Sequence, residues 1–300
     1  MKGRLYRIII LILTIVCFLS IFIAVSFAYF SSYLRIKGYT NIKIELLFDH
    51  YEESALEEYQ SGFENLTEED KVWGHKGNPY LISDKRHIYN LSVLQNNGYF
   101  YKNFIESNFD ENGVLVGNTD FSDGYEVPYF VISNPNGAPV VIDASTRVIK
   151  PVGNDQYPFI GSVVGASSSE SPVGFSASGK DLTTTTSAIH GVTVQTTKSS
   201  IDYGFFGKIS YLGIEPVIDE SLEMQTFEGY VSNISNILFS DVKVKVVSSV
   251  WEDIKDYVLN HLFYKKTFGV TEEVDPCETH HVGIIAGHVE YAKMSALSVY

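Results

Sequence analysis

The chain has 300 residues, of which 45% are hydrophobic, and it carries a formal net charge of −14 with a pI near 5.0. So acidic a protein lacks the clustered Lys and Arg that nucleic-acid phosphates and anionic lipid head groups demand, which argues against both as partners. The only cysteines are Cys17 and Cys277, and Cys17 lies in an apolar run. We therefore expect no disulfide in the rest of the chain, whose stability must come from packing.

The first predicted element is a membrane-spanning helix over residues 8–30, an uncharged apolar run. About 20 apolar residues suffice to cross a hydrocarbon core of about 30 Å. Positive residues tend to stay in the cytoplasm, so residues 31–300 are expected outside the cell. The basic residues that precede the run are Lys2, Arg4 and Arg7.

A cleaved signal peptide is the alternative for this segment, with Ser26 and Ala28 before the cleavage point. The apolar run is longer than the usual 7–15 residues of such peptides, which favours an uncleaved anchor. Both alternatives predict export. The stretch AVSFAYFSS (24–32) also resembles secretion leaders of some Gram-positive exported filament proteins, which implies a bacterial host.

We divide the chain into a cytoplasmic head and anchor (1–30), an acidic linker (31–72) and a β-rich region (73–300). The linker contains an alternating run at 42–46 that predicts a strand. Its acidic segment, 51–72, predicts a short helix and solvated coil, because such sequences bury little apolar surface.

The β-rich region opens with a predicted strand, a helix and a second strand. Tyr80–Ile82 form the first strand, Ser83 is the predicted N-cap of the helix, and Gly98 suits the left-handed position that ends it. An aromatic strand is expected at 99–101. Apolar residues at a spacing of three mark the buried helix face: Ile88, Leu91 and Leu94.

Beyond residue 128, short runs rich in Val, Ile, Phe and Tyr alternate with turn residues and predict strands. Residues 166–188 are rich in Ser and Thr and predict a loop. Residues 251–262 have the spacing of an inserted helix. The predicted strands are 129–133, 140–143, 148–153, 158–165, 191–196, 204–209 and 237–247.

An internal repeat relates YGFFGKISYLG (203–213) to HVGIIAGHVEYAKM (281–294). Repeats with a shared apolar core and unequal connecting loops are typical of coiled β-solenoids. The repeat predicts these core residues: Phe205, Phe206, Ile209, Ile284, Ile285 and Val289.

The segment WGHKGNPYLISDKRHIYNLSVLQNNGYFY (73–101) resembles the opening segment of bacterial surface proteins that carry GLUG-type repeats. Three later segments resemble the strand–turn segments that follow in those proteins: VIKPVGNDQYPFIGSVVG, GVTVQTTKSSIDYGFFGKIS and FEGYVSNISNILFSDVKV. The resemblance implies a right-handed parallel β-helix over residues 73–300, preceded by a short capping helix. Because ALSVY at the C-terminus reads as an uncovered strand, we also expect a piece of a longer protein.

One group of side chains could hold a metal ion. Thiolate and imidazole are ligands of zinc, although their spacing here matches no standard zinc motif. On a strand, two adjacent histidines would point to opposite faces, which favours surface histidines as the alternative. The candidate ligands are Cys277, His280, His281 and His288.

Paired carboxylates could support polysaccharide cleavage, with Arg147 or Lys150 as a basic partner. No pair stands out, and a solvated acidic face is the simpler interpretation. Calcium could bind at 154–155 or 120–124, although no complete calcium loop is present. The candidate carboxylates are Asp120, Asp123, Glu126, Asp143, Asp155, Asp202, Asp219 and Asp241.

These patterns predict a mainly β, membrane-anchored extracellular protein with a structural or adhesive role and no required cofactor. Its expected partners are the membrane, through residues 8–30, and a carbohydrate or another cell-surface protein. An exported polysaccharide lyase or hydrolase on the same fold is the alternative, because fold does not fix function.

Overall fold

The computed structural model describes residues 47–168, 173–177, 180–197, 202–213, 229–247 and 281–300. The chain divides into two compact units, Met1–Leu47 and Phe48–Tyr300, and the description below concerns the second. Within the described ranges no helix is both long and apolar enough to cross a membrane. The predicted anchor, the strand at 42–46 and the helix at 251–262 lie outside these ranges.

The described region is mainly β, and most of its strand pairs are parallel. The largest sheet has eight strands, and two of them, β12 and β17, pair with β13 beside the main path. Its order is β1 (Tyr80–Leu81), β2 (Tyr129–Ile132), β5 (Ser162–Gly165), β13 (Gly229–Ser240), β8 (Ala188–His190) and β3 (Val141–Asp143), with β12 (Tyr211–Gly213) and β17 (Ala292–Val299) on β13.

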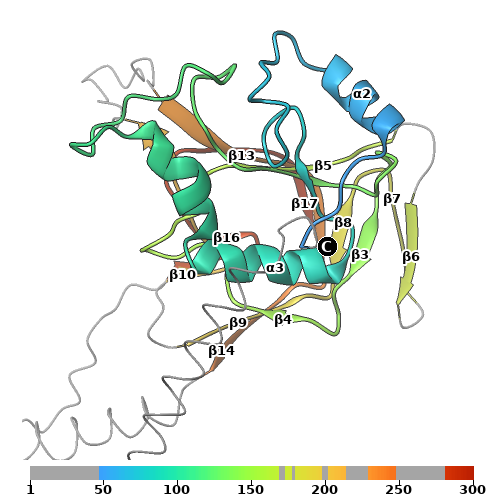
Figure 1. Cartoon of the computed structure of the whole chain (residues 1–300). Helices are drawn as coiled ribbons and strands as arrows, with labels where there is room; N and C mark the ends of the chain where they lie inside the picture. The colour runs from blue at the N-terminus through green and yellow to red at the C-terminus, as the bar shows by residue number, and fades with distance from the viewer. Residues whose placement is uncertain (1–46, 169–172, 178–179, 198–201, 214–228, 248–280) are drawn as a thin grey trace, which may run out of the picture. The chain divides into compact units, whose positions relative to one another are not determined.

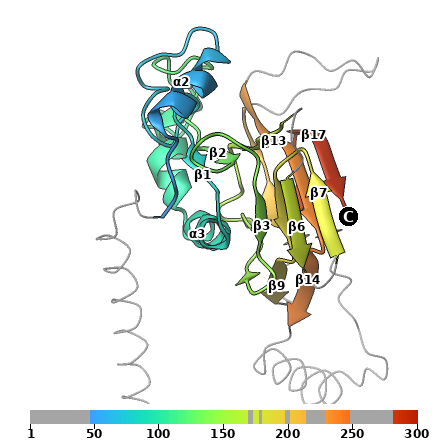
Figure 2. The same cartoon turned by 90° about the vertical axis from the view of Figure 1, so that its right-hand side faces the viewer.

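Three smaller parallel sheets accompany this sheet. Figure 2 shows the strands side by side, with the early helices on one side and β17 on the other. The smaller sheets are β4 (Val148–Ile149) with β9 (Thr193–Thr197) and β14 (Lys243–Val247), β10 (Asp202–Tyr203) with β15 (His281–Val282), and β11 (Phe206–Ile209) with β16 (Ala286–Val289).

Equivalent apolar residues stack from strand to strand, and their ladders form the core. One ladder runs in register through Tyr80, Phe130, Val163, Ile234 and Met294. All but Met294 are buried. Because neighbouring strands lie about 4.8 Å apart, such a ladder keeps apolar side chains in continuous contact. Three further ladders share this arrangement: Ile142–Ile189–Phe239, Ile149–Val194–Val244 and Phe159–Ile209–Val289.

The helices lie at the start of the described region, as Figure 1 shows. The first strand of the predicted series and the buried helix face at Ile88, Leu91 and Leu94 are present. Gly98 follows α3 with φ of 73°, in the left-handed region. The elements are α2 (Glu53–Ser61), α3 (Lys85–Asn96), the π-helix η2 (Tyr101–Ile105) and the 3-10 helix η3 (Glu106–Asn108).

Two local expectations differ from the structure. The N-cap of α3 is Asp84, whose carboxylate accepts hydrogen bonds from the backbone N–H groups of Arg86 and His87, whereas the Ser83 hydroxyl bonds Asp49. The aromatic strand expected at 99–101 is helical instead. Helical spacing buries Phe100 and Phe104 on one face, and this burial outweighs the strand preference of aromatic residues.

Helix α3 packs against β4 and donates hydrogen bonds to carbonyl groups of the segment that follows this strand. Ser92 Oγ donates to Lys150 O (2.7 Å), and Asn96 Nδ2 donates to Pro151 O (2.6 Å). Gln95 Nε2 donates to the carbonyls of Tyr157 and Pro158 at 3.1 and 3.0 Å. Because buried carbonyls without partners are costly, these side-chain donors stabilise the packing of α3 on the segment after β4.

The Ser/Thr-rich segment also differs from the predicted loop. It contains an antiparallel hairpin of β6 (Val173–Ala177) and β7 (Lys180–Thr184). Threonine is a good strand former, so paired strands suit this composition once a turn brings them together.

The two segments of the internal repeat lie on neighbouring strands, because Phe206 of β11 pairs with Ala286 of β16. Phe205, Phe206 and Ile209 are buried, and Ile285 is half-buried. Ile284 and Val289 are 43% and 42% exposed, contrary to the expected core positions. Among the described strands, β16 pairs only with β11, so these two side chains lie at the end of the stack.

Candidate metal centre

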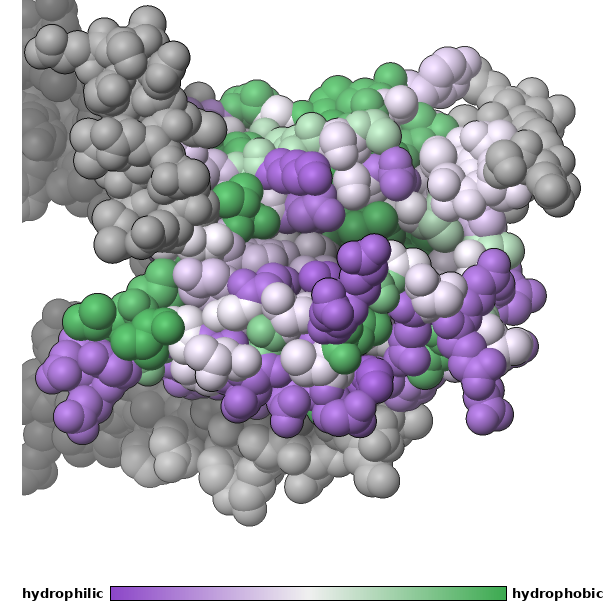
Figure 3. All heavy atoms as spheres, turned by 90° about the horizontal axis from the view of Figure 1, so that it is seen from above, coloured by the Kyte–Doolittle hydropathy of each residue, from purple (hydrophilic) through white to green (hydrophobic). Residues whose placement is uncertain are grey.

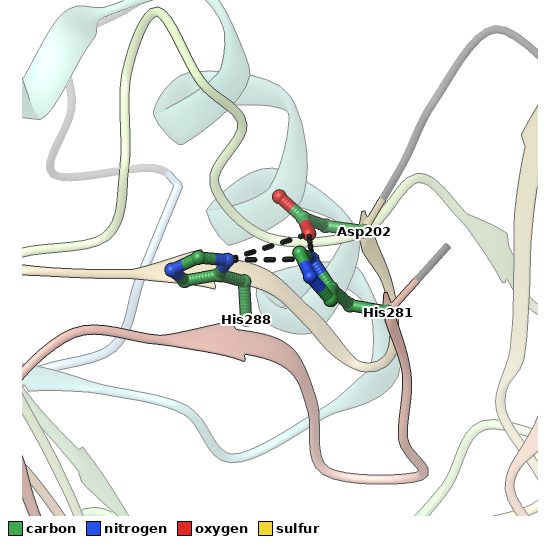
Figure 4. Close-up of side chains that lie close together, drawn as sticks. All are labelled: Asp202, His281 and His288. Atoms are coloured by element: carbon green, nitrogen blue, oxygen red, sulfur yellow. Dashed lines mark hydrogen bonds and ion pairs between the residues drawn. The ribbon is translucent and has the colours of Figure 1, made fainter. Parts of the chain in front are cut away.

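Three potential metal ligands converge where β10, β15 and β16 meet. Asp202 of β10 lies in register with His281 of β15, and His288 follows on β16. Asp202 is buried, whereas the two imidazoles are half-exposed. Figure 4 shows the three side chains pointing toward one another, each from a different strand.

The distances between the ligand atoms suit a small divalent cation. His281 Nδ1 lies 2.8 Å from Asp202 Oδ1, and His288 Nδ1 lies 3.9 Å from the same oxygen. The two Nδ1 atoms are 3.3 Å apart. A tetrahedral zinc ion with bonds of about 2.0–2.1 Å separates its ligands by about 3.3 Å. The triangle of ligand atoms therefore has the right size, with one or more coordination positions left open.

The imidazole of His288 is oriented by a second group of side chains. His288 Nε2 lies 3.4 Å from Glu290 Oε1, an ion-pair distance if the imidazole is protonated, while Nδ1 faces Asp202 and His281. Glu290 also accepts from Ser210 Oγ (2.8 Å) and pairs with Lys208 Nζ (3.0 Å). Histidines that bind metals commonly have a carboxylate beside the ring nitrogen that does not bind the metal, and this carboxylate fixes the orientation of the ring.

The charges around Glu290 are consistent with this arrangement. Burial alone would raise the pKa of Glu290, but the hydrogen bonds from Ser210 and Lys208 outweigh it and lower that pKa. Burial likewise opposes the charge of Lys208, but the bond to Glu290 and the negative charges of Glu290, Asp155 and Asp202 together outweigh burial and raise the pKa of Lys208. Glu290 is therefore held as a carboxylate that can orient His288.

A close approach of two backbones brings the three residues together. A Cβ atom at Gly287 would lie 2.5 Å from the backbone nitrogen of Tyr203, so only glycine lets β16 run so close to β10. The bend between β15 and β16 then returns the chain so that the rings of His281 and His288 lie 4.9 Å apart. Local backbone packing thus fixes two ligands that are seven residues apart.

The sequence predicted two of these three ligands. His281 and His288 are brought together, and Cys277 and His280 lie outside the described residues. Asp202 was identified only as a carboxylate candidate. The internal repeat held the missing signal, because aligning Tyr203 with Val282 places Asp202 beside His281.

Among the other predicted carboxylates, Asp155 shares Lys208 with Glu290, and Asp219 lies outside the described residues. Lys76 lies 4.0 Å from Asp123, and the segment 120–124 forms a turn. The other described contacts are Asp120 N–H to Asn118, Glu126 with Ser107, Asp143 with Ser145, Asp155 with Lys208, and Asp241 with Lys243.

The described contacts of the two candidate basic partners are of other kinds. The Arg147 guanidinium lies 5.9 Å from the Tyr89 ring centroid, and the Lys150 carbonyl accepts from α3. Neither described contact joins these residues to a pair of carboxylates, as an acid–base site for glycoside cleavage requires.

A Ser–His–Asp cluster formed by Ser83, His87 and Asp49 also appears at the start of α3. His87 Nδ1 accepts from the Ser83 backbone N–H at 3.2 Å and also lies 3.3 Å from the Ser83 hydroxyl oxygen. The Ser83 hydroxyl bonds the Asp49 carboxylate, and Asp49 lies 4.0 Å from His87 Nε2. The basic nitrogen nearest the serine is thus already engaged, which argues against a nucleophilic serine.

The Asp202, His281 and His288 group is therefore the described site with the clearest chemistry. Three protein ligands and an open position can bind zinc either to link strands or to polarise a bound molecule. Comparison of the chain with protein-family models, curated proteins and solved structures finds no match.

Proposed function

We propose that the stacked strands are coils of a parallel β-helix, of the kind implied by the resemblance to GLUG-type repeats. The in-register ladder from Tyr80 to Met294 supports this, because each step is parallel. Parallel neighbours cannot be joined by a tight hairpin, so the chain must make a long connection before it returns. Repeated returns over the same apolar ladder generate a coil.

The proposed function is that of a membrane-anchored extracellular protein with a structural or adhesive role. The single observation that carries it is the continuous parallel ladder, which gives a rigid body with a free outer surface. The apolar run at 8–30 would attach this body to the membrane, and the net charge of −14 suits exposure to solvent.

The metal centre would serve this role by linking strands. Asp202, His281 and His288 come from three strands of two adjacent coils, so one zinc ion would hold the last described coil to the preceding one. An ion that binds only the folded protein stabilises it in proportion to the logarithm of its concentration. Zinc would therefore strengthen the part of the stack with the most exposed apolar side chains.

Surface labelling of intact cells tests the proposed location. Val148 is 51% exposed, so a Val148→Cys variant in a chain with Cys17 and Cys277 replaced by serine offers one accessible thiol. We expect a membrane-impermeant maleimide to label this variant in intact cells and the protein to sediment with membranes. Labelling that requires lysis would contradict the proposal, and Ile149→Cys, which is buried, is the matched control.

Gain of adhesion tests the proposed role. Cells that produce the chain should adhere to one another or to a glycan- or protein-coated surface more than cells with an empty vector. A chain that is displayed on the surface without any change in adhesion or envelope integrity would contradict an adhesive or structural role.

An exported polysaccharide-active enzyme is the second candidate, and the open coordination position of the metal centre favours it. Zinc with three protein ligands can polarise a substrate or activate water. The purified protein, with added Zn²⁺ or Ca²⁺, would be incubated with a panel of polysaccharides. Release of reducing or unsaturated ends, lost in His281→Ala, would support the enzyme, and no release would leave the structural role.

A further inference from the structure

A second site lies between α2 and the large sheet, away from the metal centre. An open pocket of about 570 Å³ is bounded by α2 on one side and by β2, β5 and β13 on the other. Figure 3 views the molecule from the side of α2, where hydrophilic and hydrophobic residues surround a hollow. Pockets for small ligands commonly have volumes of about 300–1,000 Å³.

The helical side of the pocket is aromatic. Tyr51, Tyr59 and Phe63 line it, with ring centroids 5.2 Å apart for the tyrosines and 5.1 Å apart for Tyr59 and Phe63. Lys76 Nζ lies 5.7 Å from the Phe63 centroid. The rings are half-buried, and burial raises the pKa of both tyrosines, so their phenols stay neutral. This wall offers apolar faces with hydroxyl groups at their edge.

The sheet side of the pocket is polar and contains an unused hydrogen-bond acceptor. Asn233 and Ser235 of β13 lie there, with Asn136 and Ser167 nearby. Asn233 Oδ1 is buried and has no hydrogen-bond partner among the described residues. This oxygen has almost no solvent-accessible surface, so a ligand donor reaches it only after the Asn233 side chain rotates toward the pocket, and the cost of leaving a buried carbonyl oxygen unpaired favours that rotation.

The charge of the lining restricts the class of ligand. Glu58 and Lys76 are the charged residues that line the pocket, one of each sign. Such a lining selects neither a phosphate nor a cation. A neutral ligand with an apolar face and several hydroxyl groups matches both walls, and a pyranose ring has this character.

We propose that this pocket binds a neutral hexose or N-acetylhexosamine unit of a glycan. The C–H face of the sugar would lie against Tyr59 and Tyr51, and a sugar hydroxyl or amide would donate to Asn233 Oδ1. The proposal rests on the proposed adhesive function and specifies its ligand class. It requires neither the metal centre nor the open strand edge.

Binding of defined sugars to the full-length chain in detergent tests the proposal. The probes are oligosaccharides of glucose, galactose, mannose, N-acetylglucosamine and N-acetylgalactosamine, measured by calorimetry and saturation-transfer NMR. Asn233→Ala should weaken binding by about tenfold without lowering the melting temperature, because no described protein bond of Oδ1 is lost. Tyr59→Ala should weaken binding by a similar factor.

Matched variants separate loss of the site from loss of fold. Asn103→Ala removes an exposed amide outside the pocket and should bind as the parent chain does. Ala166→Trp should block the pocket while the melting temperature stays near that of the parent. A folded parent chain that binds none of the sugars, or Asn233→Ala and Ala166→Trp variants that bind as well as the parent, would overturn the proposal.

These results are distinguishable from failure of the proposed function. Surface labelling reports the location of the chain whether or not sugars bind. Cells whose adhesion survives Asn233→Ala would retain the adhesive role while the pocket loses its assignment. Sugar binding by a chain that is never displayed would support the pocket and contradict the adhesive role.

Discussion

The first and last strands of the described stack are stabilised in different ways. Near the first strands, helix α3 packs against β4, buries Ile88, Leu91 and Leu94, and donates side-chain hydrogen bonds to carbonyl groups in the segment 150–157. At the other end, β16 and β17 present exposed apolar side chains, among them Val289 and Val299. There the links between strands include Asp202–His281 and Ser210–Glu290. Apolar burial thus dominates the first end, and polar contacts gain importance at the last.

The largest effect on stability should come from shortening a buried side chain of one ladder, compared with shortening its exposed register partner. Ile209 is fully buried and its partner in register, Val289, is 42% exposed. Ile209→Ala should lower the free energy of unfolding by about 2–5 kcal/mol, since it leaves a cavity. Val289→Ala should change it by about 0.5 kcal/mol or less. Urea denaturation measures both, and equal losses would show that β16 is as well covered as the interior strands.

Added zinc should stabilise the protein through the Asp202, His281 and His288 group alone. At a free concentration one hundred times its dissociation constant, it should add about 2.7 kcal/mol to the free energy of unfolding of the parent chain. Asp202→Asn and His288→Ala should remove this increment, because each deletes a ligand atom. His190→Ala, outside the cluster, is the control. An increment that survives Asp202→Asn would place the metal elsewhere.

The free energy of unfolding should fall when helix α3 loses its N-cap, Asp84. Asp84→Ala should cost about 0.5–2 kcal/mol, because two N–H groups of α3 lose their acceptor. Asp84→Asn should retain most of the stability, since asparagine is an equally good cap. Burial raises the pKa of Asp84, but the bonds from Arg86 outweigh burial and lower it. The contribution of the carboxylate should therefore be present near neutral pH and fade as the pH falls below about 3.9, through the folded-state value.

The smallest effect should be a pH dependence at His87. Burial lowers the pKa of this residue, and the opposing attraction of Asp84 and Asp49 is weaker. The unfolded chain therefore binds a proton first, and stability should fall as the pH drops below about 6.5. His87→Gln should flatten this part of the stability–pH curve. An unchanged slope would show that His87 titrates as in the unfolded chain.

Short-range patterns predicted much of the fold. The spacing of Ile88, Leu91 and Leu94 identified α3, and runs of Val, Ile and Phe identified most strands, because both signals are local. The helical turn at Phe100 and Phe104 was missed, since aromatic residues suit a strand unless tertiary packing rewards helical spacing.

The complete metal centre could not be predicted without knowing how strands far apart in the sequence pair. His281 and His288 were predicted from their residue type, but Asp202 is 79 positions from His281 and becomes its neighbour only through the pairing of β10 with β15. Tyr203 pairs with Val282, whereas Phe206 pairs with Ala286, so the repeat contains one extra residue in the later segment. Spacing within one segment cannot reveal such an offset.

Disulfide trapping of the outermost smaller sheet tests the parallel stacking most directly. Gln195 and Lys245 are exposed register partners on β9 and β14, and parallel neighbours lie about 4.8 Å apart, within reach of a disulfide. In a chain with Cys17 and Cys277 replaced by serine, we expect the Gln195→Cys/Lys245→Cys pair to oxidise readily. The pair Gln195→Cys/Val247→Cys, offset by two residues, should oxidise far more slowly. Faster oxidation of the offset pair would contradict the parallel register and, with it, the coiled fold.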